Sequence, residues 1–129
     1  MSEPTLEEKL SFNAELAIQR MKELARLELR YDAESVQLLS DYINRSRLSM
    51  AEDVKQGMVN LLGSYLGECI RHQFGGTWQY TENGLAIIVN DKFGAFPFNK
   101  IRKQFDHGEA DSITSFFNNI PALLGGLPK

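Results

Sequence analysis

The stretch from Ser49 to Gly76 constrains the fold more than any other part of the chain. Ser49 and Glu52 have the spacing of a capping box, and the helix they open meets no proline before the Gly75-Gly76 pair, which is a strong helix stop. At 100° per residue, its apolar side chains cover about half of the helix circumference. These side chains are Val54, Met58, Val59, Leu61, Leu62, Tyr65, Leu66, Cys69 and Ile70. We therefore expect a central helix that is packed on two sides.

Two glycines, Gly63 and Gly67, lie one turn apart on the opposite side of this predicted helix. Each lowers helix propensity by about 1 kcal/mol relative to alanine, so a compensating interaction is expected. One interpretation is the close approach of another backbone, as at helix crossings lined by small residues. The alternative is a groove left open for a partner.

Two helices are predicted before the central one. Thr5 and Glu8 form a possible capping box for a helix over residues 6–29, in which apolar residues recur at helical spacing. Asp32 is a good N-cap for a second helix, which should fray near residues 45–47. This second helix carries an apolar side formed by Val36, Leu39, Tyr42 and Ile43.

After the double glycine the apolar period changes to two, which is typical of strands. Residues 77–81 and 85–89 are predicted to form a hairpin through Glu82-Asn83-Gly84, because Asn-Gly is a strong hairpin signal. Residues 90–94 predict a second turn, and residues 95–98 a short third strand. Pro97 cannot donate a ladder hydrogen bond, so this strand belongs at an edge. Trp78 should be largely buried against the end of the central helix.

Short helices are expected after the sheet. Asn99 can cap one that carries Ile101 and Phe105 inward and ends at Gly108, and Asp111 can cap a last one that Pro121 terminates. The buried stripe of that last helix would be Ile113, Phe116, Phe117 and Ile120. The predicted fold is α+β, with three N-terminal helices, a small antiparallel sheet of two or three strands and one or two C-terminal helices. At 129 residues a single domain, residues 1–129, is expected.

Charge and cysteine content narrow the classes of partner. The formal net charge of −3 argues against non-specific binding to nucleic acid or to anionic membranes. Residues 1–53 hold 11 acids and 7 bases, whereas residues 54–129 hold 6 acids and 7 bases, so an anionic partner would meet the second half. Cys69 is the only cysteine, which excludes an internal disulfide, and the start MSEPTLEEKL lacks the pattern of a secretion signal. We expect a cytoplasmic protein.

Three segments of the second half resemble a widespread family of small bacterial domains of unknown function. They are Tyr65-Leu66-Gly67-Glu68-Cys69-Ile70-Arg71, then Gly75-Gly76-Thr77-Trp78, then Pro97-Phe98-Asn99-Lys100-Ile101-Arg102-Lys103, followed by the helix start Asp111-Ser112-Ile113. The resemblance covers about residues 59–117. It supplies no catalytic residue, and because some such acidic domains are encoded beside toxins, it implies an immunity-type role as one expectation.

Glu68 and His72 are the most suggestive polar pair, since their i,i+4 spacing puts them on one helix face at the edge of the apolar arc. They could be an acid–base couple or two metal ligands, or an ordinary hydrogen-bonded pair that closes the core. A zinc site needs three or four ligands, and only His107 is left as a second imidazole, so no metal is expected. Cys69 falls inside the apolar arc, where a thiol is usually inert.

One basic concentration stands out, interleaved with phenylalanines: Lys92, Lys100, Arg102 and Lys103. Such a segment can serve single-stranded nucleic acid or an acidic protein partner, and the acidic chain favours the protein. The alternative is a merely solvated face. The three charges between residues 100 and 103 are expected to form a solvated ridge beside the edge strand.

The sequence carries no phosphate loop, dinucleotide fingerprint or nucleophile elbow. The leading hypothesis is a non-catalytic protein-binding domain without a cofactor, of which an immunity-type protein is one version. A small-ligand sensor with a pocket between helices and sheet is an alternative, as is an enzyme that uses Glu68 and His72.

Overall fold

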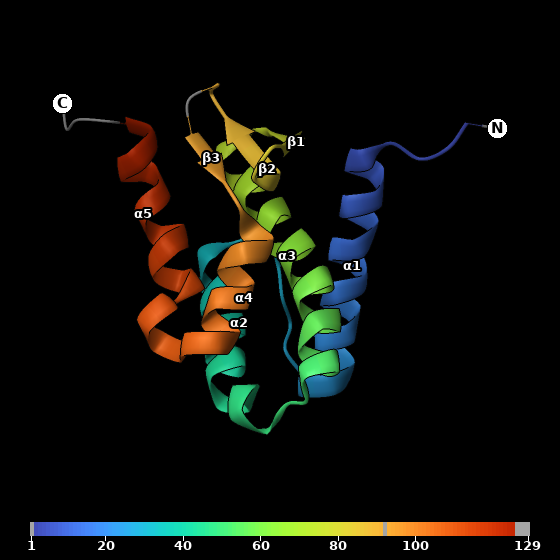
Figure 1. Ribbon diagram of the computed structural model, residues 1–129, viewed down its shortest axis with the longest axis vertical. Coiled ribbons are helices and arrows are strands. Elements are labelled where there is room, and N and C mark those ends of the chain that lie inside the picture. Colours follow the sequence, from blue (N-terminus) through green and yellow to red (C-terminus); the bar gives the residue numbers. More distant parts are fainter. Residues whose placement is uncertain (1, 92, 126–129) are drawn as a thin grey trace.

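The computed structural model describes residues 2–91 and 93–125, and it has the predicted α+β class (Figure 1). In these described residues, five α-helices and three strands follow one another in the predicted order. They are α1 (Leu6–Ala25), α2 (Ala33–Ser46), α3 (Glu52–Phe74), β1 (Thr77–Thr81), β2 (Gly84–Val89), β3 (Phe93–Ala95), α4 (Pro97–His107) and α5 (Ile113–Gly125), with short 3-10 helices at Arg47–Ser49 and Gly108–Asp111.

Helix α3 is the centre of the molecule. Helix α1 packs along one side of it, whereas α4 packs along the other and is joined there by α2 and α5 (Figure 1). The sheet lies over the C-terminal half of α3. Every residue from Leu62 to Ile70 is buried, so the expectation of a helix packed on two sides is confirmed.

The first helix is shorter than its periodicity predicts. The Thr5–Glu8 capping box is present, but the helix ends at Ala25 because Arg26 adopts a left-handed backbone conformation with φ 57°. The chain then runs extended, which lets Leu29 reach the core. The prediction of a helix to residue 29 is therefore wrong.

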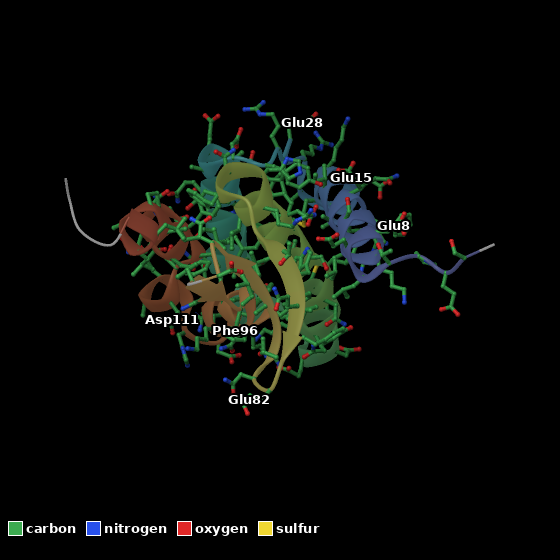
Figure 2. The ribbon with its side chains drawn as sticks, turned by 90° about the horizontal axis from the view of Figure 1, so that it is seen from above. Glu8, Glu15, Glu28, Glu82, Phe96 and Asp111 are labelled. Atoms are coloured by element: carbon green, nitrogen blue, oxygen red, sulfur yellow. The ribbon has the colours of Figure 1, made fainter. Side chains whose placement is uncertain are left out.

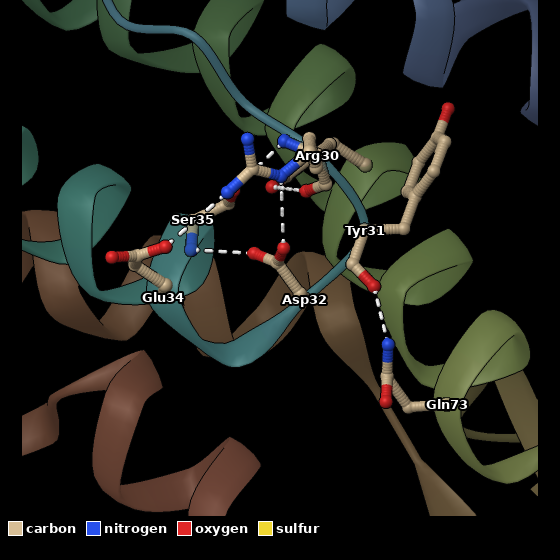
Figure 3. Close-up of polar contacts among 7 residues, drawn as sticks. Arg30, Tyr31, Asp32, Glu34, Ser35 and Gln73 are labelled. Atoms are coloured by element: carbon tan, nitrogen blue, oxygen red, sulfur yellow. Dashed lines mark hydrogen bonds and ion pairs between the residues drawn. The ribbon is translucent and has the colours of Figure 1, made fainter.

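The loop between α1 and α2 is held by polar contacts that Figure 3 displays. Asp32 caps α2, as predicted, by accepting a hydrogen bond of 2.9 Å from the Ser35 amide. Hydrogen bonding to Ser35 holds the pKa of the Asp32 carboxyl below its ordinary value. Arg30 donates to Asp32 and Glu34 across the helix start. The side chain of Gln73, from the end of α3, donates to the Tyr31 carbonyl at 2.7 Å and so ties this loop to the central helix.

The predicted capping box of the central helix does not form. Ala51 occupies the N-cap without a side-chain hydrogen bond, while Ser49 lies in a 3-10 turn and donates to the Ser46 carbonyl. Local continuation of α2 into this turn removes Ser49 from the cap position. The predicted extent of the helix, from Glu52 to the double glycine, is confirmed.

The sheet is antiparallel in the order β1-β2-β3, with Trp78 opposite Ile87 and Ile87 opposite Ala95. These three residues share the face that packs on α3, and Trp78 is 5% exposed, as expected. The predicted hairpin is confirmed. The third strand is not where the sequence predicts it, because Pro97 occupies the first turn of α4, where its missing amide costs nothing.

Two caps in the C-terminal part also differ from prediction. Phe96, not Asn99, precedes α4, because Pro97 starts that helix three residues earlier than an Asn99 cap would allow. Ser112, not Asp111, caps α5: its hydroxyl accepts from the Thr114 amide at 3.1 Å. The inward positions of Ile101 and Phe105 and the end of α4 at Gly108 are confirmed.

Pro121 does not end the last helix, which continues to Gly125. A proline has helical φ and removes only one backbone hydrogen bond, so a final turn can follow it near a helix end. Of the predicted stripe, Ile113, Phe117 and Ile120 are buried and Phe116 is half-buried. Residues 126–129 lie outside the described residues.

Candidate functional site

The carboxylate of Glu68 lies at the junction of α3 and the hairpin. It is 2% exposed, and it accepts hydrogen bonds from the Trp78 indole N–H at 2.9 Å and from Arg71 at 3.0 and 3.2 Å. Arg71 also contacts the carbonyl of Gly76 at 3.4 Å and the Glu7 carboxylate at 3.7 Å. A buried carboxylate needs such partners, and here they tie the first strand to the helix end.

His72 points away from this cluster. It is exposed, and its ring stacks on Tyr31 with centroids 4.1 Å apart. The Tyr31 hydroxyl donates to Glu15 at 2.6 Å, and burial together with this acceptor raises the pKa of the phenol above its ordinary value. The structure therefore does not bring Glu68 and His72 together as an acid–base couple.

Aromatic rings occupy the space beside Gly63 and Gly67 of α3, where the absence of a side chain leaves two notches in the helix surface. A Cβ added at Gly63 would overlap the ring of Phe98, and one added at Gly67 would overlap the ring of Trp78. The predicted close approach is present, but the approaching group is a side chain and not a backbone. Each ring takes the volume that a methyl group would need, so these positions are closed and not a groove for a partner.

The remaining candidates for nucleophile or metal ligand are separated. Cys69 is fully buried, and burial raises the pKa of its thiol to about 12. The exposed ring of His107 contacts Asp111 at 2.5 Å. Within residues 2–91 and 93–125, no group of three or more His, Cys, Asp or Glu side chains is placed to hold a metal ion.

The basic segment is not one continuous ridge. Arg102 forms an ion pair with Glu52 of α3, which raises the pKa of the guanidinium. The ammonium of Lys100 lies 4.9 Å from the centroid of the Phe116 ring, on the α5 side of the helix. Lys103 is exposed, and Lys92 lies outside the described residues. The structure thus places Lys100 and Lys103 about 60° apart around α4 and turns Arg102 away from them.

A groove of about 280 Å³ lies between the hairpin turn and the start of α4, and its lining ends at Asn99, the residue before Lys100 in the chain. Figure 2 shows Glu82, at the hairpin turn, and Phe96, before α4, at the same end of the sheet. The groove is lined by Asn83, Gly84, Leu85, Phe96, Phe98 and Asn99. The sequence analysis did not predict it because residues 95–98 were assigned to a third strand, whereas in the structure Pro97 starts α4, so that Phe96 precedes the helix and Phe98 lies in its first turn.

A buried hydrogen-bond network, which the sequence analysis did not predict, joins α2, α4 and α5. Gln104 is fully buried; its side-chain amide donates to Ser40 and Asn44 of α2, at 2.9 Å each, and accepts from the Ile113 amide at 2.8 Å. The signal was available, since Gln104 shares the inward face of Ile101 and Phe105. All its polar atoms have partners, which is typical of a structural group.

Comparison of the chain with protein-family models, with curated proteins and with solved structures gave no match. The family resemblance of residues 59–117 stays a prediction. Among the described residues, none of the helices has the length and apolar character needed to cross a membrane.

Proposed function

We propose that this chain is a non-catalytic protein-binding domain whose groove at the hairpin turn receives an apolar side chain of an acidic partner. Residues of this groove, together with two lysines of the following α4 turns, are called the hairpin groove surface: Leu85, Phe96, Phe98, Asn99, Lys100 and Lys103. The observation that carries the proposal is the coincidence of a solvent-open aromatic groove with lysines of α4 that have no carboxylate partner among the described residues.

The chemistry of the surface supports an acidic and apolar partner. Aromatic side chains are enriched at the centres of protein interfaces, and Phe96 and Phe98 are both half-buried at the groove. Asn99 and Lys103 lie one turn apart on the exposed side of α4, so a carboxylate of the partner could reach the lysine while its apolar neighbour fills the groove. Lysines at a rim accelerate association with an acidic surface.

The same observations weigh against catalysis as the main role. The groove lining offers amide and apolar groups but no titratable side chain, and the buried Glu68 carboxylate is occupied by Trp78 and Arg71. An acid–base step needs a titratable group within reach of a substrate.

An immunity-type role is a finer version of the proposal, in which the partner is a toxin. It adds one requirement, which is that binding suppresses the partner's toxicity. Expression of the chain together with a toxin recovered as its partner would test this requirement separately from binding.

The binding proposal is tested by affinity capture from the native host with the wild-type chain and the double variant Lys100→Glu/Lys103→Glu. The expected result is a stoichiometric acidic partner for the wild type and at least about tenfold weaker binding for the variant, with a reduced salt dependence. The matched control Lys22→Glu/Lys55→Glu makes the same change of net charge away from the groove and should bind normally. A partner that binds both double variants with equal affinity would place the interface elsewhere.

A further inference from the structure

Helix α1 has an outer face that no other part of the described chain covers. The helix packs on α3 and touches β1, and no element lies outside it in Figure 1. Its core side is formed by Leu10, Ala14, Ala17 and Met21. Phe12 points in nearly the opposite direction and is 68% exposed.

Five residues of this outer face lie within an arc of about 80° at 100° per residue. In order along the helix they are Lys9, Phe12, Leu16, Arg20 and Glu23, and together they are called the α1 face. Lys9, Arg20 and Glu23 are exposed, and no hydrogen bond or ion pair within residues 2–91 and 93–125 engages their side chains. Their charges are therefore available to a partner.

The surface of α1 carries two grooves. A groove of about 670 Å³ lies on the N-terminal side of Phe12, and one of about 310 Å³ lies on the other side, next to Leu16. The Phe12 ring is thus a ridge between two hollows. Ridges that enter grooves are the geometry by which two helices pack.

The residues of the α1 face are spaced symmetrically about Leu16, and the residues at equivalent positions are complementary in chemistry. Phe12 and Arg20 lie four residues to either side of it, and Lys9 and Glu23 lie seven residues to either side. If a second α1 crosses the first in the antiparallel direction at Leu16, each Lys9 meets Glu23 of the second copy, and each Phe12 lies near an Arg20. Opposite charges then face each other, and an arginine can lie against an aromatic ring.

A parallel arrangement would instead put lysine against lysine and glutamate against glutamate, which is unfavourable. A twofold axis requires a surface that is complementary to itself, and the antiparallel arrangement meets this requirement. We propose that the chain forms a homodimer through the α1 face, with the two α1 helices antiparallel and crossing at Leu16. One helix from each copy makes a small interface, so the dimer is expected to be weak and concentration-dependent.

This proposal is independent of the binding function. Helix α1 and helix α4 lie on opposite sides of α3, so a dimer through α1 leaves the hairpin groove surface open in both copies (Figure 1). Failure of either proposal leaves the other standing.

Sedimentation equilibrium of the full chain over a wide concentration range tests the dimer. We expect a monomer–dimer equilibrium in the wild type, and each single reversal, Lys9→Glu or Glu23→Lys, should raise the dimer dissociation constant roughly tenfold, because it changes two symmetric pairs. The combined Lys9→Glu/Glu23→Lys variant restores opposite charges and should recover wild-type dimerisation. The matched control Glu82→Lys, at the hairpin turn, should dimerise normally.

Two outcomes would overturn the proposal: a wild-type chain that is monomeric at every concentration, or single reversals that weaken the dimer without recovery in the combined variant. Phe12→Ala provides a second line of evidence, since the exposed ring contributes little to the monomer's core and its loss should still weaken the dimer. Circular dichroism of each variant verifies that the fold is kept.

Discussion

The junction of α3 with the hairpin and the basic segment of α4 both combine charges with aromatic rings, but the structure uses them in opposite ways. At the junction, Glu68 is buried and its partners come from its own helix and from β1. In the basic segment, Lys103 is exposed, and among the described residues of this segment only Arg102 is paired with a carboxylate. The first region ties the hairpin to α3, whereas the second leaves the charge of Lys103 exposed to solvent.

The comparison shows that residue type alone does not distinguish side chains that stabilise the fold from side chains that are exposed to solvent. Removing one partner from a buried pair leaves the other without compensation, while an exposed charge is solvated whether or not it is paired. The two regions should therefore respond in different ways to substitution, the junction through stability and the basic segment through binding.

The largest effect is expected at Gly67. Gly67→Ala should lower the free energy of unfolding by about 2–3 kcal/mol, because the new methyl group must displace the buried ring of Trp78. Gly57 in the same helix provides the control: no atom lies within 4 Å of a Cβ there, so Gly57→Ala should stabilise the helix by up to about 1 kcal/mol. Urea unfolding of both variants measures the contrast, and equal shifts would mean that the ring does not fill the notch.

A smaller loss is expected at Glu68. Glu68→Ala should destabilise the protein by about 2 kcal/mol, because the indole N–H of Trp78 and the partly buried Arg71 lose their acceptor. His72→Ala, one turn further along, should cost less than about 1 kcal/mol, since it removes only an exposed stack on Tyr31. Thermal unfolding compares the two, and similar losses would indicate that the residues act as a pair.

The burial of Cys69 can be tested through the reactivity of its thiol and through the dependence of stability on pH. Because burial raises its pKa to about 12, only about one thiol in ten thousand is ionised at pH 8, and modification by a disulfide reagent should be very slow in the native state. The raised pKa adds to stability below the ordinary thiol pKa near 9, and this part is lost as the pH rises towards 12. Rapid modification at pH 8 without denaturant would contradict the burial.

The smallest effect on stability is expected in the basic segment. Lys103→Glu should change the free energy of unfolding by less than about 0.5 kcal/mol, because the side chain is exposed and unpaired among the described residues. Arg102→Glu should cost about 1 kcal/mol, since it replaces the ion pair with Glu52 by a repulsion. Equal stability of the two variants would show that the Glu52 contact contributes nothing.

Most of the fold could be predicted from the chain because the apolar periods are strong. The change from helical spacing to alternation at Gly75-Gly76 located both α3 and the hairpin. Apart from the misplaced third strand, the errors lie at helix ends, where several residues could serve as caps. Ser49, Asn99 and Asp111 all have the right chemistry, but the neighbouring turns placed other residues in the cap positions.

The candidate site could be predicted only in part. The sequence singled out Lys100 and Lys103, but it grouped them with Arg102, whose partner Glu52 is 50 residues away in the chain. It also paired Glu68 with His72 by their spacing, although spacing on a helix does not reveal that an indole and a guanidinium already occupy the carboxylate.

The sequence by itself determined the order and type of the elements, the central place of α3 and the burial of Trp78, because these follow from local periodicity and from the tendency of apolar surface to leave water. Only the tertiary structure decided which ring fills each glycine notch, which carboxylate neutralises Arg102 and where a groove opens beside α4. These outcomes depend on pairs of residues far apart in the chain, such as Gly63 with Phe98 and Glu52 with Arg102. Such pairs form only when the helices and the sheet close on one another, and no local pattern encodes them.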